Sequence, residues 1–159
     1  MSAPSPSPEN LPPGAGVYAD GAHHFPVRVY FEDTDAGGIV YHANYLRFME
    51  RARSDMLRLL GISQRGALEA GEGAYAVASL SIDYRVPARL DDDLLVVSRV
   101  SGVAGATVRM AQQVMRGKTL LTQASVTVAF LSAQGRPKRQ PRQWVDLFNS
   151  ITSGDTSPQ

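Results

Sequence analysis

The sequence predicts an α+β domain in which one long helix packs against an antiparallel sheet. Two observations predict this class: a helical hydrophobic period runs over about residues 42–60, and four long segments with alternating hydrophobicity follow it. A fifth, shorter alternating segment precedes the helix. The chain has 159 residues, which suits one domain, and its 43% of hydrophobic residues is enough for a core.

The two ends of the chain differ in composition from the part between them. Proline and serine alternate near the amino terminus, and the last residues are again polar. Segments of this kind bury little apolar surface and therefore do not fold by themselves. We expect a disordered extension over residues 1–24, the folded domain over residues 25–148 and a flexible tail over residues 149–159.

The central helix is the element with the clearest signal. Its apolar residues recur at spacings of three and four, and Gly61 supplies a stop after them. A helix of this length would extend about 27 Å. The apolar positions are Tyr45, Phe48, Met49, Ala52, Met56, Leu59 and Leu60. The positions expected to face solvent are Arg47, Glu50, Arg51, Asp55 and Arg58.

The remaining segments read mainly as strands. Strands are expected at residues 26–31, 76–86, 94–100, 107–115 and 119–131, with a short helical turn at 63–70 and an amphipathic turn or helix at 140–148. A long curved sheet of five antiparallel strands around a central helix is the hotdog architecture. One copy leaves unpaired sheet edges, so we expect a homodimer or homotetramer.

Composition excludes several classes of protein. The chain has no cysteine, which excludes disulfides and thiolate metal sites, and its three histidines are few for a structural metal site. A net charge of +1 gives no reason to expect a nucleic-acid partner. No run approaches the roughly 18 apolar residues of a membrane span. The first ten residues carry no basic residue and no apolar stretch, so we expect no secretory signal and a cytoplasmic protein.

The chemically informative stretch precedes and opens the helix. It holds two carboxylates in a turn, Asp33 and Asp35, then Gly37 and Gly38, and then His42 where the helix starts. Unpaired N–H groups and the helix macrodipole stabilise negative charge at such a position. The alternative is structural: the aspartates form the turn and cap the helix, the histidine is a satisfied residue at a helix start, and the glycines permit unusual backbone angles.

The same stretch resembles a known family. The segment R-V-Y-F-E-D-T-D-A-G-G-I-V-Y-H-A-N-Y-L-R-F-M-E-R-A-R over residues 28–53 resembles acyl-CoA thioesterases of the 4-hydroxybenzoyl-CoA thioesterase class. Within that class it is similar to the Tol–Pal-associated YbgC branch. Residues 83–92, D-Y-R-V-P-A-R-L-D-D, give a second, weaker match. The resemblance covers about residues 26–130 and implies a hotdog fold and a bacterial, cytoplasmic thioesterase.

The resemblance also implies roles for particular residues. Asp35 matches the family's catalytic carboxylate, and His42 matches the histidine that accompanies it in the YbgC branch. The helix N-terminus, here Tyr41 to Ala43, points backbone N–H groups at the thioester oxygen in the family. Asp35 acts either as a base toward water or as a nucleophile. His42 orients water, binds the substrate or fixes the turn.

Other candidates keep two interpretations each. Tyr45 lines the acyl pocket or packs in the core. Lys138 and Arg139 belong to a basic cluster, with Arg136 and Arg142, that either binds the phosphates of coenzyme A or is solvated surface. Asp33 is expected to be structural.

The expected reaction is hydrolysis of a short- to medium-chain acyl-CoA, or of an acyl carrier protein thioester, to acid and thiol. A thiol with a pKa near ~8.5 leaves as thiolate with little acid assistance, so no metal or cofactor is required. Two alternatives remain at this point. One is a hotdog dehydratase. The other is an acyl-CoA or carrier-protein binding subunit of a lipid-synthesis or envelope complex. Release of free thiol from acyl-CoA separates hydrolysis from both.

Overall fold

The structure is a computed structural model and describes residues 14–152. Three helices, a short 3-10 helix and six strands follow one another along these residues. In chain order they are β1 (Val17–Ala19), β2 (Ala22–Arg28), η1 (Phe31–Asp33), α1 (Asn44–Leu59), α2 (Gln64–Glu69), β3 (Ala74–Tyr84), β4 (Asp93–Val103), β5 (Thr107–Arg116), β6 (Thr119–Leu131) and α3 (Arg142–Ile151). The α+β class predicted from the sequence is confirmed.

The sheet has six strands in the order β1-β2-β4-β5-β6-β3, where five were predicted. All neighbouring pairs are antiparallel. The additional strand β1 pairs with β2 through a turn at Asp20 and Gly21, whose φ angles are 53° and 72°. Asp-Gly is a favoured pair for a two-residue hairpin in which both central residues have positive φ.

This hairpin corrects the expected start of the folded domain. The predicted boundary at residue 25 falls inside β2, and residues 17–24 are strands or the turn between them rather than an extension. At the other end α3 continues to Ile151, past the expected end at residue 148. The rest of the expected extension and tail, residues 1–13 and 153–159, lies outside the described residues.

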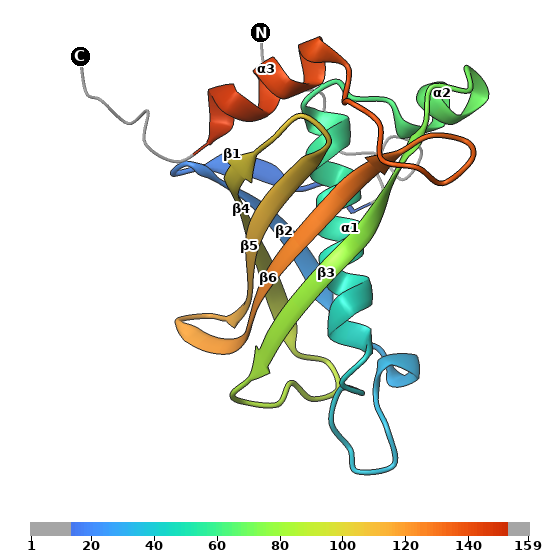
Figure 1. Cartoon of the computed structure of the whole chain (residues 1–159). Helices are drawn as coiled ribbons and strands as arrows, with labels where there is room; N and C mark the ends of the chain where they lie inside the picture. Colours follow the sequence, from blue (N-terminus) through green and yellow to red (C-terminus); the bar gives the residue numbers. More distant parts are fainter. Residues whose placement is uncertain (1–13, 153–159) are drawn as a thin grey trace, which may run out of the picture.

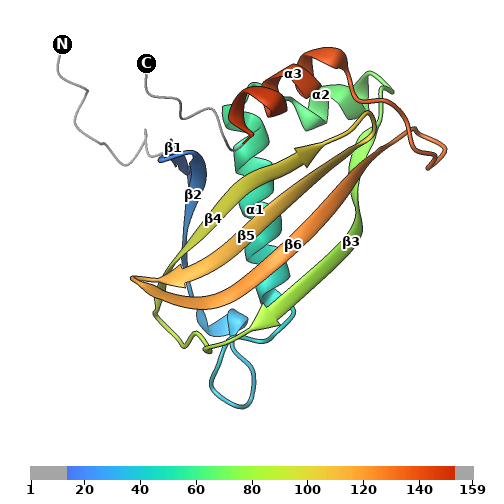
Figure 2. The same ribbon diagram turned by 60° about the vertical axis from the view of Figure 1, so that its left-hand side comes forward.

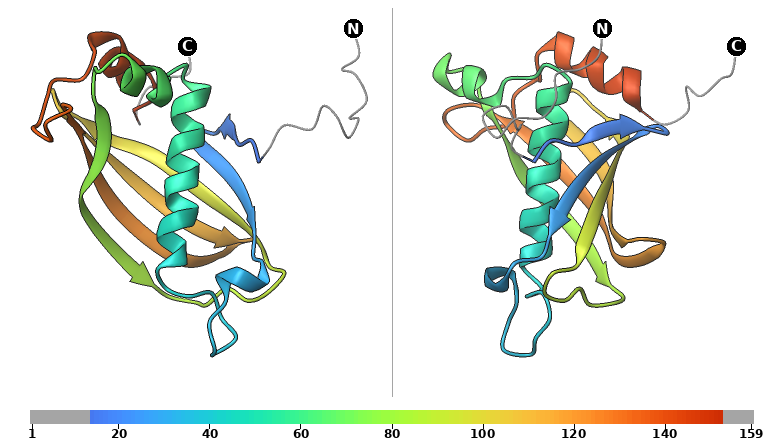
Figure 3. Two further views of the ribbon diagram at one scale, coloured as in Figure 1. Left: turned by 90° about the vertical axis from the view of Figure 1, so that its right-hand side faces the viewer. Right: turned by 180° about the vertical axis from the view of Figure 1, so that it is seen from behind.

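The sheet curves around α1, and the core lies between them. Figure 3 (left) shows α1 along the concave face, with β3 on one side and β2 on the other. Figure 2 shows the long strands β4, β5 and β6 crossing in front of the helix. The predicted apolar stripe of α1 is buried at Tyr45, Phe48, Met49, Ala52 and Met56. Burying such side chains supplies about 1.5–3 kcal/mol each, so this stripe holds helix and sheet together.

The buried face of α1 is wider than its hydrophobic pattern predicts. Arg53 is buried and its Nη1 donates to the Gln112 side-chain oxygen at 2.9 Å. Asp55, expected to face solvent, is buried against His23 of β2, with 2.7 Å between a carboxylate oxygen and Nε2. The prediction for Asp55 was wrong because the sheet and the β1–β2 hairpin enclose the helix on more than one side.

The two ends of the molecule have different roles. In Figure 1, α2 and α3 cover the end at which α1 finishes, while the loop from residue 34 to 40 projects from the opposite end. Strand β3 forms one edge of the sheet, and most of its side chains are exposed. The start of α1, the loop before it and the last residues of β3 therefore meet at one end, where the candidate site lies.

Candidate active site

The loop before α1 is a tight turn held by its own backbone. The Asp35 N–H donates to the Ile39 carbonyl at 2.9 Å, and the Gly38 N–H donates to the Asp35 carbonyl at 3.0 Å. Gly38 has a φ of 77°, in the left-handed region where glycine is favoured. Thr34 and Val40 pair across the base of the turn. These backbone contacts hold Asp35 near the base of this loop.

The two aspartates of the D-T-D motif have different surroundings. Asp33 is 8% exposed, and its carboxylate accepts the Tyr30 N–H at 2.8 Å. The Asn44 side-chain amide donates to the Asp33 carbonyl at 3.1 Å, which ties η1 to the first residue of α1. Asp35 is exposed, and its Oδ1 accepts the Gly37 N–H at 2.8 Å. Asp33 therefore has structural contacts, whereas the Asp35 carboxylate is open to a ligand.

The two residues that precede α1 leave their N–H groups available. The helix begins at Asn44, two residues later than predicted. The Tyr41 N–H is already used, because it donates to the Asp33 carbonyl at 2.9 Å. Within residues 14–152, no hydrogen bond involves the N–H of His42 or that of Ala43. Backbone donors were expected at Tyr41 and Ala43. Of these two, only the Ala43 N–H is unpaired among the described residues, and the His42 N–H is a further unpaired donor.

Asp35 and His42 line an open cavity of about 390 Å³. It is lined by three segments: the Asp35 loop, the start of α1 and the end of β3 with the residues that follow. Pockets that bind small ligands commonly enclose about 300–1,000 Å³, so the space suits a ligand of modest size. The lining residues are Asp35, Ile39, Val40, His42, Tyr45, Tyr84, Arg85, Val86 and Pro87.

Tyr45 lies between the core and the cavity. It is 3% exposed and packs in the core, and it also lines the cavity. Its hydroxyl accepts the Ala88 N–H at 3.0 Å, which fastens the segment after β3 to α1. Burial raises the pKa of Tyr45, and the hydrogen bond from Ala88 opposes this effect.

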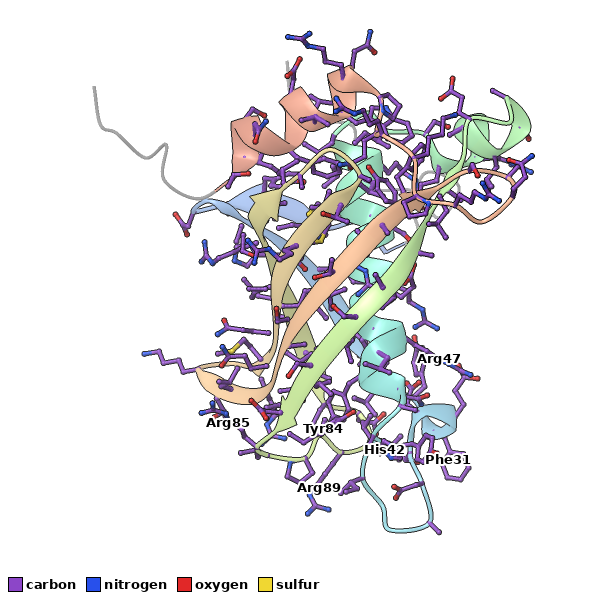
Figure 4. All side chains as sticks on the ribbon, in the orientation of Figure 1. Phe31, His42, Arg47, Tyr84, Arg85 and Arg89 are labelled. Carbon is purple, nitrogen blue, oxygen red and sulfur yellow. The ribbon has the colours of Figure 1, made fainter. Side chains whose placement is uncertain are left out.

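Tyr84 is a cavity residue that the sequence analysis did not single out. Its hydroxyl donates to the His42 carbonyl at 2.8 Å, and its ring lies edge-on to those of His42 and Tyr45. Figure 4 shows Tyr84 and His42 together at the lower end of the molecule, with Arg85 and Arg89 nearby. The weaker family match over residues 83–92 was the signal that could have identified it.

The basic residues predicted to bind phosphate lie elsewhere in the chain. Lys138 donates from Nζ to the Glu72 carbonyl at 2.6 Å, in the segment between α2 and β3. That corner is at the α2 and α3 end of the molecule (Figure 1), and Arg139 is the next residue along the chain. A single copy of the chain therefore does not bring Lys138 and Arg139 together with Asp35.

Metal-binding clusters and membrane-spanning helices are both absent from the described residues. Across residues 14–152 there is no cluster of three or more histidine, cysteine, aspartate or glutamate side chains suited to a metal ion. None of the helices that the structure describes is long and apolar enough to cross a membrane.

The arrangement suits attack on an activated carbonyl. An exposed carboxylate and a histidine line one cavity, and the backbone N–H groups of that histidine and of the next residue, Ala43, are unpaired. A carboxylate activates water or attacks directly, and preorganised N–H donors stabilise the oxyanion that forms.

Comparison with known proteins identifies the family. The sequence model of the thioesterase superfamily matches residues 37–123, more than half of the chain. This chain belongs to the thioesterase superfamily. The match includes the end of the Asp35 loop, α1 and the strands that follow, so the family assignment rests on the segments that build the cavity.

Individual relatives agree with this assignment. The chain is 53% identical over 133 residues to "Acyl-CoA thioesterase YbgC" of Haemophilus influenzae, covering 83% of this chain and 98% of that protein. It is 41% identical over 126 residues to "Acyl-CoA thioester hydrolase YbgC" of Escherichia coli, covering 78% and 93%. The crystal structure of a probable thioesterase from Bartonella henselae has a TM-score of 0.72 at 36% identity, covering 76% of this chain and 99% of that one. The predicted resemblance and the hotdog fold are confirmed.

Proposed function

We propose that this superfamily member hydrolyses the thioester of an acyl-CoA to a free acid and coenzyme A. The single observation that carries the proposal is the cavity that the exposed Asp35 carboxylate shares with His42, whose N–H group and that of the adjacent Ala43 are unpaired. The names of the 53% and 41% identical relatives support the same substrate class.

Each group has one task in the proposed reaction. Asp35 takes a proton from water as the water oxygen bonds to the thioester carbon, and the carbonyl becomes an oxyanion. The N–H groups of His42 and Ala43 donate to that oxyanion, where one such donor contributes roughly 2.7–4 kcal/mol in other enzymes. The C–S bond then breaks, the thiolate leaves and takes up a proton, and the acid remains. In the alternative route Asp35 attacks directly, and water hydrolyses the resulting anhydride.

The cavity favours a short- to medium-chain acyl group. Its volume of about 390 Å³ is moderate, and Ile39, Val40 and Val86 supply an apolar wall. Coenzyme A and acyl carrier protein present the same pantetheine arm, so either serves as the thiol carrier in this proposal.

We further propose that two copies pair through β3. This strand has 11 residues, stands at the sheet edge, and leaves Val77 49% exposed. A long exposed edge of this kind is a ready template for strand pairing. If the two copies of β3 run antiparallel, the first residues of one strand lie beside the last residues of the other. The Glu72 corner of one copy then approaches the Tyr84 end of its partner.

This pairing would allow the basic residues to bind phosphate, which is one of the two interpretations that the sequence left open for them. Lys138 is bonded to Glu72 just before β3, so in the pair it approaches the partner's cavity, where the phosphates of coenzyme A would emerge. A double variant, Lys138→Ala with Arg139→Ala, is expected to raise KM for acyl-CoA several-fold because charge-assisted contacts are lost. KM for an acyl-pantetheine, which lacks those phosphates, should be unchanged. An equal rise for both thioesters would contradict the role.

The experiment that tests the function is thiol release from purified protein. A disulfide dye reports free thiol across an acyl-CoA panel from acetyl to palmitoyl with benzoyl-CoA included, and acyl carrier protein thioesters are assayed beside it. We expect turnover that peaks at short or medium chains. Absence of turnover on every member, with binding retained, would overturn the proposal and favour a binding subunit. Water addition to an enoyl-CoA without thiol release would favour a dehydratase.

A further inference from the structure

Tyr84 makes a contact with the backbone before α1 that has no part in the proposed reaction steps. It is the last residue of β3, and its hydroxyl donates to the His42 carbonyl, 42 residues away in sequence, at 2.8 Å. The helix itself does not hold this carbonyl. The Leu46 N–H, which is four residues further on, donates to the Ala43 carbonyl at 3.1 Å instead. Tyr84 is therefore the group that fixes the His42 carbonyl among the described residues.

The geometry of the peptide bond gives this contact a consequence. The His42 carbonyl and the Ala43 N–H belong to one planar trans peptide group, so fixing the direction of one fixes the direction of the other. A hydrogen bond to the carbonyl also polarises the N–H of the same group and makes it a better donor. The Ala43 N–H is one of the two unpaired donors at the start of α1.

We propose that Tyr84 is a positioning residue, whose hydroxyl holds the His42–Ala43 peptide group so that the Ala43 N–H is preorganised to stabilise the oxyanion. This inference rests on the proposed thioester hydrolysis. Tyr84 acts through the peptide group and takes no proton in the reaction.

The surroundings of Tyr84 hold its ring in place. Its ring lies edge-on to that of Tyr45, with centroids 5.5 Å apart, and Tyr45 is itself fastened to Ala88. The two tyrosines thus join α1 and the end of β3 reciprocally: Tyr45 reaches from the helix to the segment after the strand, and Tyr84 reaches from the strand to the helix start. Partial burial raises the pKa of Tyr84, so its hydroxyl keeps its proton across the range in which a carboxylate base works.

The test removes one oxygen atom. Tyr84→Phe keeps the aromatic ring, and we expect kcat to fall about 10-fold, less than the loss of an oxyanion donor itself. KM should stay within about 2-fold, because a preorganised donor matters most in the transition state. Tyr18→Phe is the matched control, since the Tyr18 hydroxyl also donates to a backbone carbonyl of α1, that of Met56, at the far end of the helix. It is expected to retain the wild-type kcat.

A second readout does not depend on activity. In an NMR spectrum of ¹⁵N-labelled protein, Tyr84→Phe should shift the Ala43 amide proton upfield and speed its exchange with solvent, and Tyr18→Phe should do neither. An unchanged kcat, a rise in KM alone, or an unmoved Ala43 amide would each overturn the inference. If the wild-type protein releases no thiol, the proposed function fails. The shift of the Ala43 amide then still decides whether the Tyr84 hydroxyl holds the His42–Ala43 peptide group.

Discussion

At the scale of single residues, identical side chains acquire different roles through burial. Asp33 and Asp35 are separated by one residue, yet one is enclosed by the Tyr30 and Asn44 amides and the other faces the cavity. The sequence predicted Asp35 and His42 because they lie in one uninterrupted motif. The match over residues 83–92 includes Tyr84, but the sequence could not predict its contact, because the partner is a backbone atom 42 residues away and leaves no trace in the pattern of side chains.

The His42 imidazole can be removed without changing the backbone donors. His42→Ala removes an exposed imidazole from the cavity but keeps the backbone N–H at the helix start. We therefore expect kcat to fall by about 10-fold, less than for loss of the carboxylate, because both backbone oxyanion donors and the base remain. Steady-state kinetics with the best substrate measures this. A kcat equal to wild type would assign His42 to the turn alone.

At the scale of elements, helices and strands with a regular hydrophobic pattern were predictable, whereas the burial of a helix face by neighbouring elements was not. The bounds predicted for β6, residues 119–131, agree with the structure because its alternation is uninterrupted. Strand β1 was missed because its three residues follow a stretch rich in proline and serine, although Asp20-Gly21 is a strong hairpin signal. The burial of Asp55 depends on β2 and the residues before β1, whose positions the helical pattern does not contain.

The Asp55 junction makes stability depend on pH. Burial lowers the pKa of His23, and the contact with Asp55 opposes this effect without reversing it. The unfolded chain binds a proton at this residue near pH about 6.5, whereas the folded chain binds it at lower pH. Between these values the unfolded state holds more protons, so the free energy of unfolding decreases as the pH falls.

Thermal melts test this sign. The Tm of the wild type should decrease from about pH 7.5 to about pH 5.5, which spans the usual histidine pKa. In His23→Gln, which cannot titrate, the decrease should be smaller even though Tm is lower throughout. An equally steep decrease in the variant would place the titrating group elsewhere.

At the scale of the whole molecule, the curved sheet leaves its two edges unequal. The β1 edge has three residues, while the β3 edge has 11 and ends at the cavity. The sequence predicted that one copy is incomplete, since unpaired edges follow from a sheet around one helix. It did not identify which strands form the edges or that Lys138 lies far from Asp35 within a chain, because both depend on the strand order.

Pairing through β3 predicts that a charge introduced on β3 dissociates the pair, whereas a charge introduced on β1 does not. Val77→Arg places a charge on the edge strand, and two such charges would approach each other in the pair, so we expect dissociation and loss of activity. Val17→Arg is the matched control, because Val17 is 60% exposed on the opposite edge strand. Analytical ultracentrifugation measures the outcome. Dissociation by Val17→Arg and not by Val77→Arg would contradict the proposed interface.

The central claim is that the reactive group is the Asp35 carboxylate at the foot of the loop before α1. The measurement that tests it most directly compares kcat and Tm of Asp35→Asn with those of Asp33→Asn on the best acyl-CoA substrate. For Asp35→Asn we predict a kcat at least about 100-fold lower, the usual loss for a general base. Its Tm should be nearly unchanged, because an amide oxygen still accepts the Gly37 N–H. For Asp33→Asn we predict a lower Tm and a kcat within about 3-fold of wild type, since its contacts are structural. Near-normal turnover in Asp35→Asn would contradict the account.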